Sequence, residues 1–421
     1  MIGSANTGKK IIKLLGFILS MLIACLNFTD DMIAARALDG AVFTNSTALC
    51  DEGAGFLETL RGSTAFSARS IGVSSSTDET LSDSSLRIKF LKLIDAASID
   101  IYESDRAELA VRGDAIGISI RTDGVIVVGF GGITLSSGET VCPAKRSGLR
   151  AGDVIKKLNG NDVCTANELQ LALNSSSGAV YLSVERSGKT VEIKAEPVFD
   201  DSCSKRLGVW VRDSTIGIGT FSFSDESSGC AAALGHAVLD ADTQTLIPVL
   251  NGSMVYADIL GVVKGRSGTP GELKGTFSSK SEAVGTVERN GVFGVFGKVA
   301  LERKDGLSIE RAELLPVAFP DEVHTGEAFI YSQLDSDAPQ RYSCRIIRTI
   351  RQKSPDQKGL VIEITDPRLI DAAGGIVQGM SGSPIIQDGM IAGVVTHVFI
   401  NDPSKGYGAY AFWIHQAMIE D

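Results

Sequence analysis

Short apolar runs separated by glycines dominate the pattern of hydrophobic and polar positions along this chain. Runs rich in Val, Ile and Phe, such as residues 292–299 and 328–331, are bounded by glycine, and long amphipathic helical patterns are scarce. Of the 421 residues, 46 are glycine, which supplies the turns between such runs. The pattern predicts a mainly β fold, and the repeated runs after residue 199 suit two packed β-barrels.

The first 40 residues have the pattern of a targeting segment. A lysine-rich stretch, residues 9–13, precedes an apolar stretch at residues 14–28, and Ala35-Arg36-Ala37 has the small-x-small form of a cleavage site. The segment is either a cleaved signal peptide or a retained membrane anchor. Either predicts that the body of the protein lies outside the cytoplasm of the cell that makes it.

Residues 41–104 carry Ser/Thr-rich patches, for example at residues 74–77 and 82–85. We expect a mostly exposed linker here. A short amphipathic helix at residues 86–97 fits the spacing of its apolar residues. A flexible segment of this kind is a typical site of proteolytic cleavage.

Residues 105–198 resemble a PDZ domain. The resemblance rests on residues 143–155, which read Pro-Ala-Lys-Arg-Ser-Gly-Leu-Arg-Ala-Gly-Asp-Val-Ile. Asn159-Gly160 predicts a tight turn, residues 167–173 a helix beside a peptide groove, and Ser187-Gly188 the turn of a hairpin.

The resemblance implies a peptide-binding loop at Ala115-Ile116-Gly117-Ile118, which is similar to the Gly-Φ-Gly-Φ loop of PDZ domains, where Φ is apolar. Backbone N–H groups of Ile116, Gly117 and Ile118 would hold a peptide that adds as a strand. Ala115 stands where those domains have the first glycine, so a terminal carboxylate is not required by this pattern. The expected occupant is a peptide or a neighbouring copy of the chain.

A glycine-framed serine near the end of the chain carries the candidate chemistry. Residues 379–384 read Gly-Met-Ser-Gly-Ser-Pro. Ser381 is the candidate nucleophile, and the N–H groups of Gly379 and Ser381 can form an oxyanion hole. Ser383 is the competing serine, but it lacks a glycine two residues before it.

A histidine supplies the candidate general base. The chain has only four histidines, and His236 lies in Gly235-His236-Ala237, 145 residues before Ser381. A serine peptidase built from two barrels takes its histidine from the first barrel and its serine from the second. Together the two motifs predict a serine nucleophile activated by His236. Residues 199–421 are therefore the expected peptidase domain.

The chain from about residue 105 to 421 resembles the stage IV sporulation protein B family, which is related to the trypsin-like serine peptidases. The matching stretches are Leu234-Gly235-His236-Ala237, Ile364-Thr365-Asp366-Pro367, residues 374–384 and residues 396–403. The resemblance implies a PDZ domain followed by a trypsin-like double β-barrel. It also implies a regulatory serine endopeptidase, secreted across the forespore membrane, that acts between the two forespore membranes and cleaves itself. Its implied substrate regulates an intramembrane metalloprotease that activates a mother-cell sigma factor.

The resemblance also implies Asp366 as the acid that orients His236. Trypsin-like enzymes usually place this residue much earlier, which leaves Asp240 and Asp258 as alternatives. A turn cap before Pro367 is the structural alternative for Asp366.

Charge and cysteine content narrow the function further. The net charge of −11 argues against nucleic-acid binding. The seven cysteines show no metal-ligand spacing, and no phosphate-binding or dinucleotide-binding motif is present, so we expect neither metal nor cofactor. Two function classes remain: a regulatory serine endopeptidase with a PDZ domain, and a non-catalytic PDZ adaptor on an inactive protease scaffold.

Overall fold

The computed structural model describes residues 106–420 with their side chains, except residues 278–282, 300–311, 336–337 and 353. Before residue 106 it describes only the backbone of four strands. The predicted targeting segment at residues 1–40 therefore lies outside the described residues, except for Gly40. Among the described residues, no helix is long and apolar enough to cross a membrane.

The four N-terminal strands form a sheet in a unit of their own. They are β1 (Gly40–Thr44), β2 (Phe66–Gly72), β3 (Ser82–Phe90) and β4 (Ile94–Glu103), in the order β1-β4-β3-β2. The described residues from 107 onward form a second compact unit, apart from residues 351, 352 and 354, which belong to the first. The expected linker therefore contains regular structure, and the helix predicted at residues 86–97 is wrong. Leu86, Phe90 and Ile94 instead lie on the antiparallel pair β3–β4.

A six-stranded barrel begins the second unit. Its strands are β6 (Ala115–Phe130), β15 (Val209–Ser224), β16 (Cys230–Leu234), β17 (Val249–Tyr256), β20 (Ala283–Val287) and β22 (Gly294–Lys298). They pair in the order β20-β17-β6-β15-β16-β22, and a bridge between Gly285 and Val299 joins the two ends. Apolar side chains such as Ile116, Phe221 and Val295 fill its core.

Shorter strands flank this first barrel. They are β5 (Glu108–Val111), β21 (Arg289–Gly291), β23 (Leu314–Pro316) and the hairpin of β18 (Asp258–Val263) and β19 (Glu272–Thr276). Beside β19, Gln378 forms a parallel bridge with Glu272. The hairpin therefore reaches the segment that precedes Ser381.

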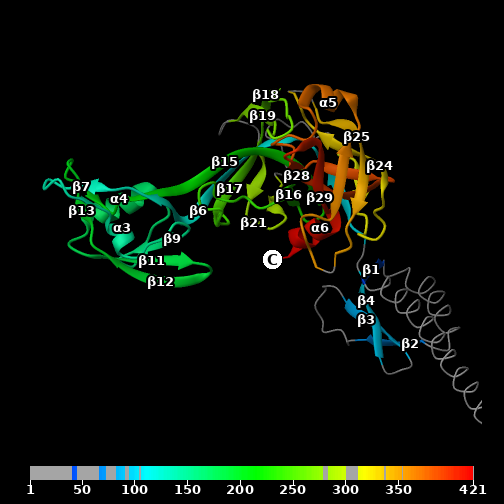
Figure 1. The fold of residues 1–421 in the computed structure, drawn as a ribbon, viewed down its shortest axis with the longest axis horizontal. Coiled ribbons are helices and arrows are strands. Elements are labelled where there is room, and N and C mark those ends of the chain that lie inside the picture. Colours follow the sequence, from blue (N-terminus) through cyan, green and yellow to red (C-terminus); the bar gives the residue numbers. More distant parts are fainter. Residues whose placement is uncertain are drawn as a thin grey trace, which may run out of the picture. The chain divides into compact units, whose positions relative to one another are not determined.

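The PDZ domain is inserted into the first barrel between β6 and β15. Both strands run through it and through the first barrel, so Val209 pairs with Phe130 in the PDZ domain while Thr220 pairs with Ala115 in the barrel (Figure 1). Its other elements are β7 (Ile133–Thr134), β8 (Thr140–Val141), α3 (Pro143–Arg146), β9 (Val154–Leu158), β10 (Asn161–Asp162), α4 (Ala166–Ser175), β11 (Val180–Arg186), β12 (Lys189–Ala195), β13 (Val198–Phe199) and β14 (Lys205–Arg206).

The predicted local features of the PDZ domain are present. Asn159-Gly160 and Ser187-Gly188 have the positive φ values that two-residue hairpin turns need. Helix α4 covers the predicted residues 167–173 and begins with a capping box at Thr165. The expected domain boundary at residues 198 and 199 does not match the sheet, because the first barrel already begins at β6.

A second, closed barrel has the order β24-β25-β26-β29-β28-β27. Its strands are β24 (Gly326–Ser332), β25 (Gln340–Thr349), β26 (Leu360–Ile364), β27 (Pro384–Gln387), β28 (Met390–Phe399) and β29 (Asp402–Tyr410). Helix α5 (Pro367–Ala373) precedes the Ser381 segment, and α6 (Ala411–Ile419) follows β29. The predicted fold class, mainly β with a PDZ domain and a trypsin-like pair of barrels, is confirmed.

Candidate active site

The segment between α5 and β27 presents Ser381 on a tight loop. Gly379 and Gly382 adopt φ values of 100° and 98°, which side-chain-bearing residues rarely adopt. Met380 is fully buried beneath the loop, while Ser381 is half-buried. The Ser381 hydroxyl donates a hydrogen bond to the Thr396 carbonyl oxygen at 3.0 Å. The loop thus places one serine hydroxyl at the surface of the second barrel.

The predicted oxyanion donors are free to act. Within the described residues, the backbone N–H groups of Gly379 and Ser381 have no protein acceptor. The carbonyl groups of the same two residues are held by Thr220 on β15, through its hydroxyl to Gly379 (2.8 Å) and its N–H to Ser381 (3.1 Å). Two unbonded amides on a fixed loop can stabilise a tetrahedral oxyanion.

The competing serine has a different environment. Ser383 is fully buried, and its hydroxyl has no partner among the described residues. A substrate cannot reach a group without solvent exposure. Of the two serines in the motif, only Ser381 can serve as a nucleophile in this conformation.

A backbone kink aims His236 at the second barrel. Strand β16 ends at Leu234, and Leu234 and Gly235 both adopt left-handed conformations, with φ of 75° and 69°. Such a conformation is costly for leucine and is typical of functional sites. The kink brings the Gly235 backbone against Val394 and Thr396 of β28, where an added Cβ would clash.

The histidine and serine segments lie side by side. A Cβ on Gly382 would collide with Thr220 and lie 2.7 Å from the Leu234 nitrogen. No hydrogen bond joins His236 to Ser381 among the described contacts, because the serine hydroxyl binds Thr396. The Nδ1 atom of His236 instead lies 2.9 Å from its neighbouring Ala237 carbonyl oxygen. This contact favours a proton on Nδ1 and leaves Nε2 as the base.

Asp366 does not orient His236 in this structure. Its side chain caps α5 by accepting the Arg368 N–H at 2.9 Å, and it also accepts the Ser343 N–H at 3.1 Å and pairs with the Arg368 guanidinium at 2.9 Å. The hydrogen bonds from Arg368 outweigh burial and lower the pKa of Asp366 to about 2. The role predicted for Asp366 is therefore corrected to the helix cap that the sequence left as its alternative.

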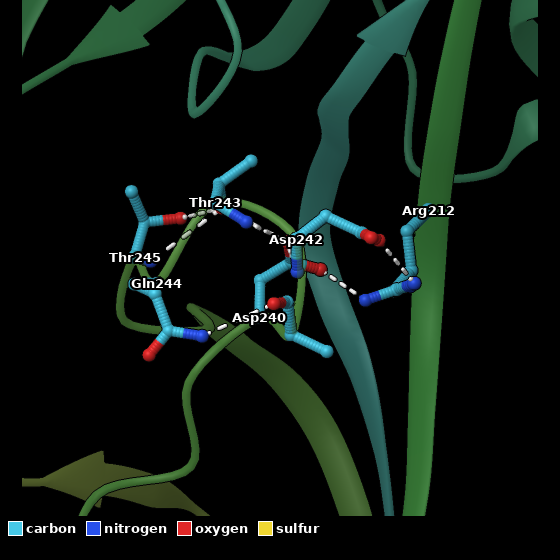
Figure 2. A network of polar contacts seen from close by, with 7 residues as sticks. Arg212, Asp240, Asp242, Thr243, Gln244 and Thr245 are labelled. Carbon is cyan, nitrogen blue, oxygen red and sulfur yellow. Dashed lines mark hydrogen bonds and ion pairs between the residues drawn. The ribbon is translucent and has the colours of Figure 1, made fainter.

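Neither of the other two acidic candidates contacts His236 among the described hydrogen bonds and ion pairs. Figure 2 shows the fully buried Asp240 bonded to Arg212 of β15 and to Thr243, whose N–H and hydroxyl both lie 2.9 Å from the carboxylate. Burial alone would raise the pKa of Asp240, but these hydrogen bonds and the Arg212 charge keep it below its usual value. Asp258 is exposed at the start of β18.

The sequence motifs passed over one residue of the site. The imidazole of His397, on β28, packs against that of His236, with ring centroids 5.3 Å apart. His397 lies next to Thr396, the residue that binds the Ser381 hydroxyl. Its only sequence signal was its place in the family-matching residues 396–403.

The predicted peptide-binding loop is wrong. Ile116, Gly117 and Ile118 form the middle of the first barrel, where β15 pairs with one edge of their strand and β17 with the other. The Phe277 side chain also occupies the space over Gly117. With both edges paired, a peptide cannot add at this point.

An open strand edge exists elsewhere in the PDZ domain. At Val209–Arg212, β15 pairs with β6 along one edge, and no described strand pairs with the other. Gly208, just before it, has φ of 72°, and the N–H groups of Leu207 and Gly208 have no acceptor among the described residues. Helix α4 lies alongside, where the Ala166 N–H donates to Asp213 at 2.9 Å.

The described residues form no cluster of metal ligands and no disulfide. No group of three or more His, Cys, Asp or Glu in them could hold a metal ion. The five described cysteines are free, and burial raises the pKa of the Cys344 thiol to about 12.

A serine hydroxyl, a histidine from the other barrel and two unbonded amides define a serine peptidase of the double-barrel class. Residues 203–415, which are 213 of the 421, match the family described as SpoIVB peptidase S55. The match covers just over half of the chain, and the chain belongs to this family. The resemblance found in the sequence is thereby confirmed. No curated protein matches the chain significantly.

Solved structures resemble parts of the chain. The active form of the Rv3671c protease from M. tuberculosis is 17% identical, with 49% of this chain and 74% of that chain covered and a TM-score of 0.27. Its inactive form is 16% identical, over 44% and 87%, with a TM-score of 0.25. The PDZ domain of an SdrC-like protein from Listeria monocytogenes is 21% identical, over 22% and 90%, with a TM-score of 0.18.

Proposed function

We propose that this peptidase is a regulatory serine endopeptidase of sporulation signalling. In this proposal it acts outside the cytoplasm, between the two forespore membranes, where an N-terminal signal or anchor has placed it. Its substrate is a protein that regulates an intramembrane metalloprotease, and the cut leads to activation of a mother-cell sigma factor. The family resemblance supports these finer points.

The proposed peptidase mechanism rests on one observation: the Ser381 segment of the second barrel lies beside the His236 segment of the first. For reaction, the Ser381 hydroxyl leaves the Thr396 carbonyl and turns to Nε2 of His236. The base takes the proton as Oγ attacks the substrate carbonyl, and it later gives this proton to the leaving amine. The Gly379 and Ser381 N–H groups receive the oxyanion.

We further propose that the chain cleaves itself within residues 41–104. The Ser/Thr-rich composition of this stretch and the behaviour implied by the family support a cut there. Mass spectrometry of the purified wild type should find an N-terminus between residues 41 and 104, and Ser381→Ala should stay full length. Mixing the two proteins shows whether wild type can trim the inactive copy. A Ser381→Ala chain trimmed equally when purified alone would mean that another protease makes the cut.

We place the partner-binding edge of the PDZ domain at Val209–Arg212 of β15. The unpaired edge and the free N–H groups of Leu207 and Gly208 support the addition of an extended peptide, from a substrate or from a neighbouring copy. Gly208→Ala puts a Cβ against the Gly131 carbonyl at positive φ, whereas Gly188→Ala strains an equally left-handed position in open space. Gly208→Ala should slow trimming of the inactive copy and Gly188→Ala should not. Equal trimming rates for the two variants would show that this edge does not recruit the substrate.

The alternative is a non-catalytic PDZ adaptor on an inactive scaffold. The hydrogen bond of Ser381 to Thr396 rather than to His236 is the observation in its favour. Catalytic hydrogen bonds are often absent from substrate-free structures, however, and both motif residues are retained. An adaptor would bind its partner equally well as wild type and as Ser381→Ala, and neither protein would be cut.

A further inference from the structure

We propose that His397 is a positioning residue of this active site, whose imidazole packs against His236 and holds that base beside Ser381. The proposal rests on the proposed peptidase function and names the group that orients its base. The two ring centroids lie 5.3 Å apart, and their planes are inclined by 38°. This is a tilted packing contact, close enough for the two rings to restrict each other's rotation.

Both reacting groups touch the strand that carries His397. The Thr396 carbonyl on β28 accepts the Ser381 hydroxyl at 3.0 Å, and the next residue packs on His236. One residue further back, the Val395 carbonyl accepts the Gly382 N–H at 2.8 Å. Three consecutive residues of β28, Val395 to His397, therefore contact both the His236 ring and the Ser381 loop.

No carboxylate performs this task among the described residues. Asp366 is committed to Arg368 and Ser343, and Asp240 to Arg212 and Thr243. The Ala237 carbonyl contacts Nδ1 of His236, which sets the tautomer but leaves the tilt of the ring open. The His397 ring supplies the second contact that a fixed orientation requires.

The charges around His397 suit this role at neutral pH. The groups that face it are His236, from the segment after β16, and Lys358, whose ammonium lies 5.1 Å from the ring centroid of Tyr407 on β29. Desolvation, and then the positive charges of His236 and Lys358, lower the pKa of His397. His397 is therefore neutral at pH 7 and does not oppose the imidazolium that forms on His236 during proton transfer.

Replacing the His397 ring distinguishes a role in positioning His236 from a general role in the stability of the fold. His397→Ala should lower kcat on a short peptide about 10- to 100-fold while KM stays within about twofold, because a displaced base acts only on the chemical step. His397→Phe keeps an aromatic ring and should restore kcat to within about fivefold of the wild-type value. The acid side of its pH–kcat profile should lack the contribution of the His397 imidazole. His324→Gln is the control, since among the described residues its exposed ring pairs only with Asp388 and the Thr325 carbonyl. An Ala variant within about twofold of wild type in kcat at every pH, or a Phe variant no better than Ala, would refute the role.

A second readout does not depend on turnover. With only four histidines in the chain, the imidazole nitrogen shifts of His236 can be followed by NMR in protein labelled at histidine. In the Ser381→Ala background, His397→Phe should shift the imidazole resonances of His236, because the ring that packs against it has changed. Unchanged His236 resonances would contradict the contact. A wild type that hydrolyses nothing would defeat the proposed function, while these resonances would still test the contact between the two rings.

Discussion

The backbone N–H of Thr220, on a strand of the first barrel, donates a hydrogen bond to the carbonyl oxygen of Ser381 in the second barrel at 3.1 Å. Its hydroxyl donates to the Gly379 carbonyl at 2.8 Å. Thr220 thus holds the carbonyl groups of the two residues that supply the proposed oxyanion hole, Gly379 and Ser381, whose own N–H groups stay free of protein acceptors among the described residues. The geometry of the active loop therefore depends on the junction of the two barrels.

Removal of the Thr220 hydroxyl should disturb this loop without unfolding the strand. Thr220→Val keeps the shape and leaves the Gly379 carbonyl without its partner, at a cost of about 1–3 kcal/mol. We expect the rate of labelling by a fluorophosphonate probe to fall roughly 5- to 100-fold.

The matched control for this change is Ser222→Ala, two residues along the same strand. Ser222 is equally buried, but its hydroxyl has no partner among the described residues. It should label at the wild-type rate. If the Thr220→Val and Ser222→Ala proteins labelled equally fast, the hydrogen bond from the Thr220 hydroxyl to Gly379 would have no role in shaping the Ser381 loop.

A methyl group on Gly382 should separate the two catalytic segments. Gly382 and Gly389 both have positive φ, 98° and 77°, so alanine is strained at either position. Only at Gly382 would the new Cβ meet other atoms, namely Thr220 and Leu234, since nothing lies within 4 Å of the Cβ position at Gly389. Gly382→Ala should abolish labelling and lower Tm, whereas Gly389→Ala should cost about 1 kcal/mol and keep activity. The opposite ranking in a labelling and thermal-unfolding comparison would show that the segments do not meet here.

Local chemistry in the sequence predicted the turns and the glycine-framed loop of Ser381, but it could not predict the pairing of strands that are distant in the chain. Asn159-Gly160 and Ser187-Gly188 form turns with the positive φ values expected of their residue types, and Gly379 and Gly382 adopt positive φ on either side of Ser381. The Ile116-Gly117-Ile118 motif resembled a loop because its pairing partner in β17 lies more than 130 residues away in the chain. The acid assignment failed for the opposite reason. A local signal was present, since an aspartate before proline and two residues before arginine is a ready helix cap, but the family match outweighed it.

Asp366 should therefore contribute to stability rather than to turnover. Asp366→Ala removes the helix cap and the ion pair with Arg368, and it should lower the free energy of unfolding by about 1–3 kcal/mol. Activity of the folded fraction on a short peptide should stay within about tenfold of wild type. A loss of about 10⁴-fold with unchanged Tm would restore Asp366 as the orienting acid.

The contribution of Asp366 should disappear in acid. Its pKa is about 2 in the folded chain, against about 3.9 when unfolded. Because the folded value is the lower one, the carboxylate stabilises the fold above about pH 4, and this stabilisation is lost as pH falls toward 2. Urea unfolding of wild type and Asp366→Asn, which keeps the cap, should differ at pH 6 and converge near pH 2. A difference that is the same at both pH values would mean that the Arg368 pair contributes nothing.

The central claim is that Ser381, activated by His236, is the nucleophile. The most direct measurement is fluorophosphonate labelling of the purified chain, followed by peptide mapping of the modified residue. The wild type should carry the phosphonyl group on Ser381, and His236→Ala should react about 10⁴- to 10⁶-fold more slowly at unchanged Tm. Ser383→Ala should label normally, because its hydroxyl is buried. Labelling that persists in Ser381→Ala, or that maps to another residue in the wild type, would contradict the account.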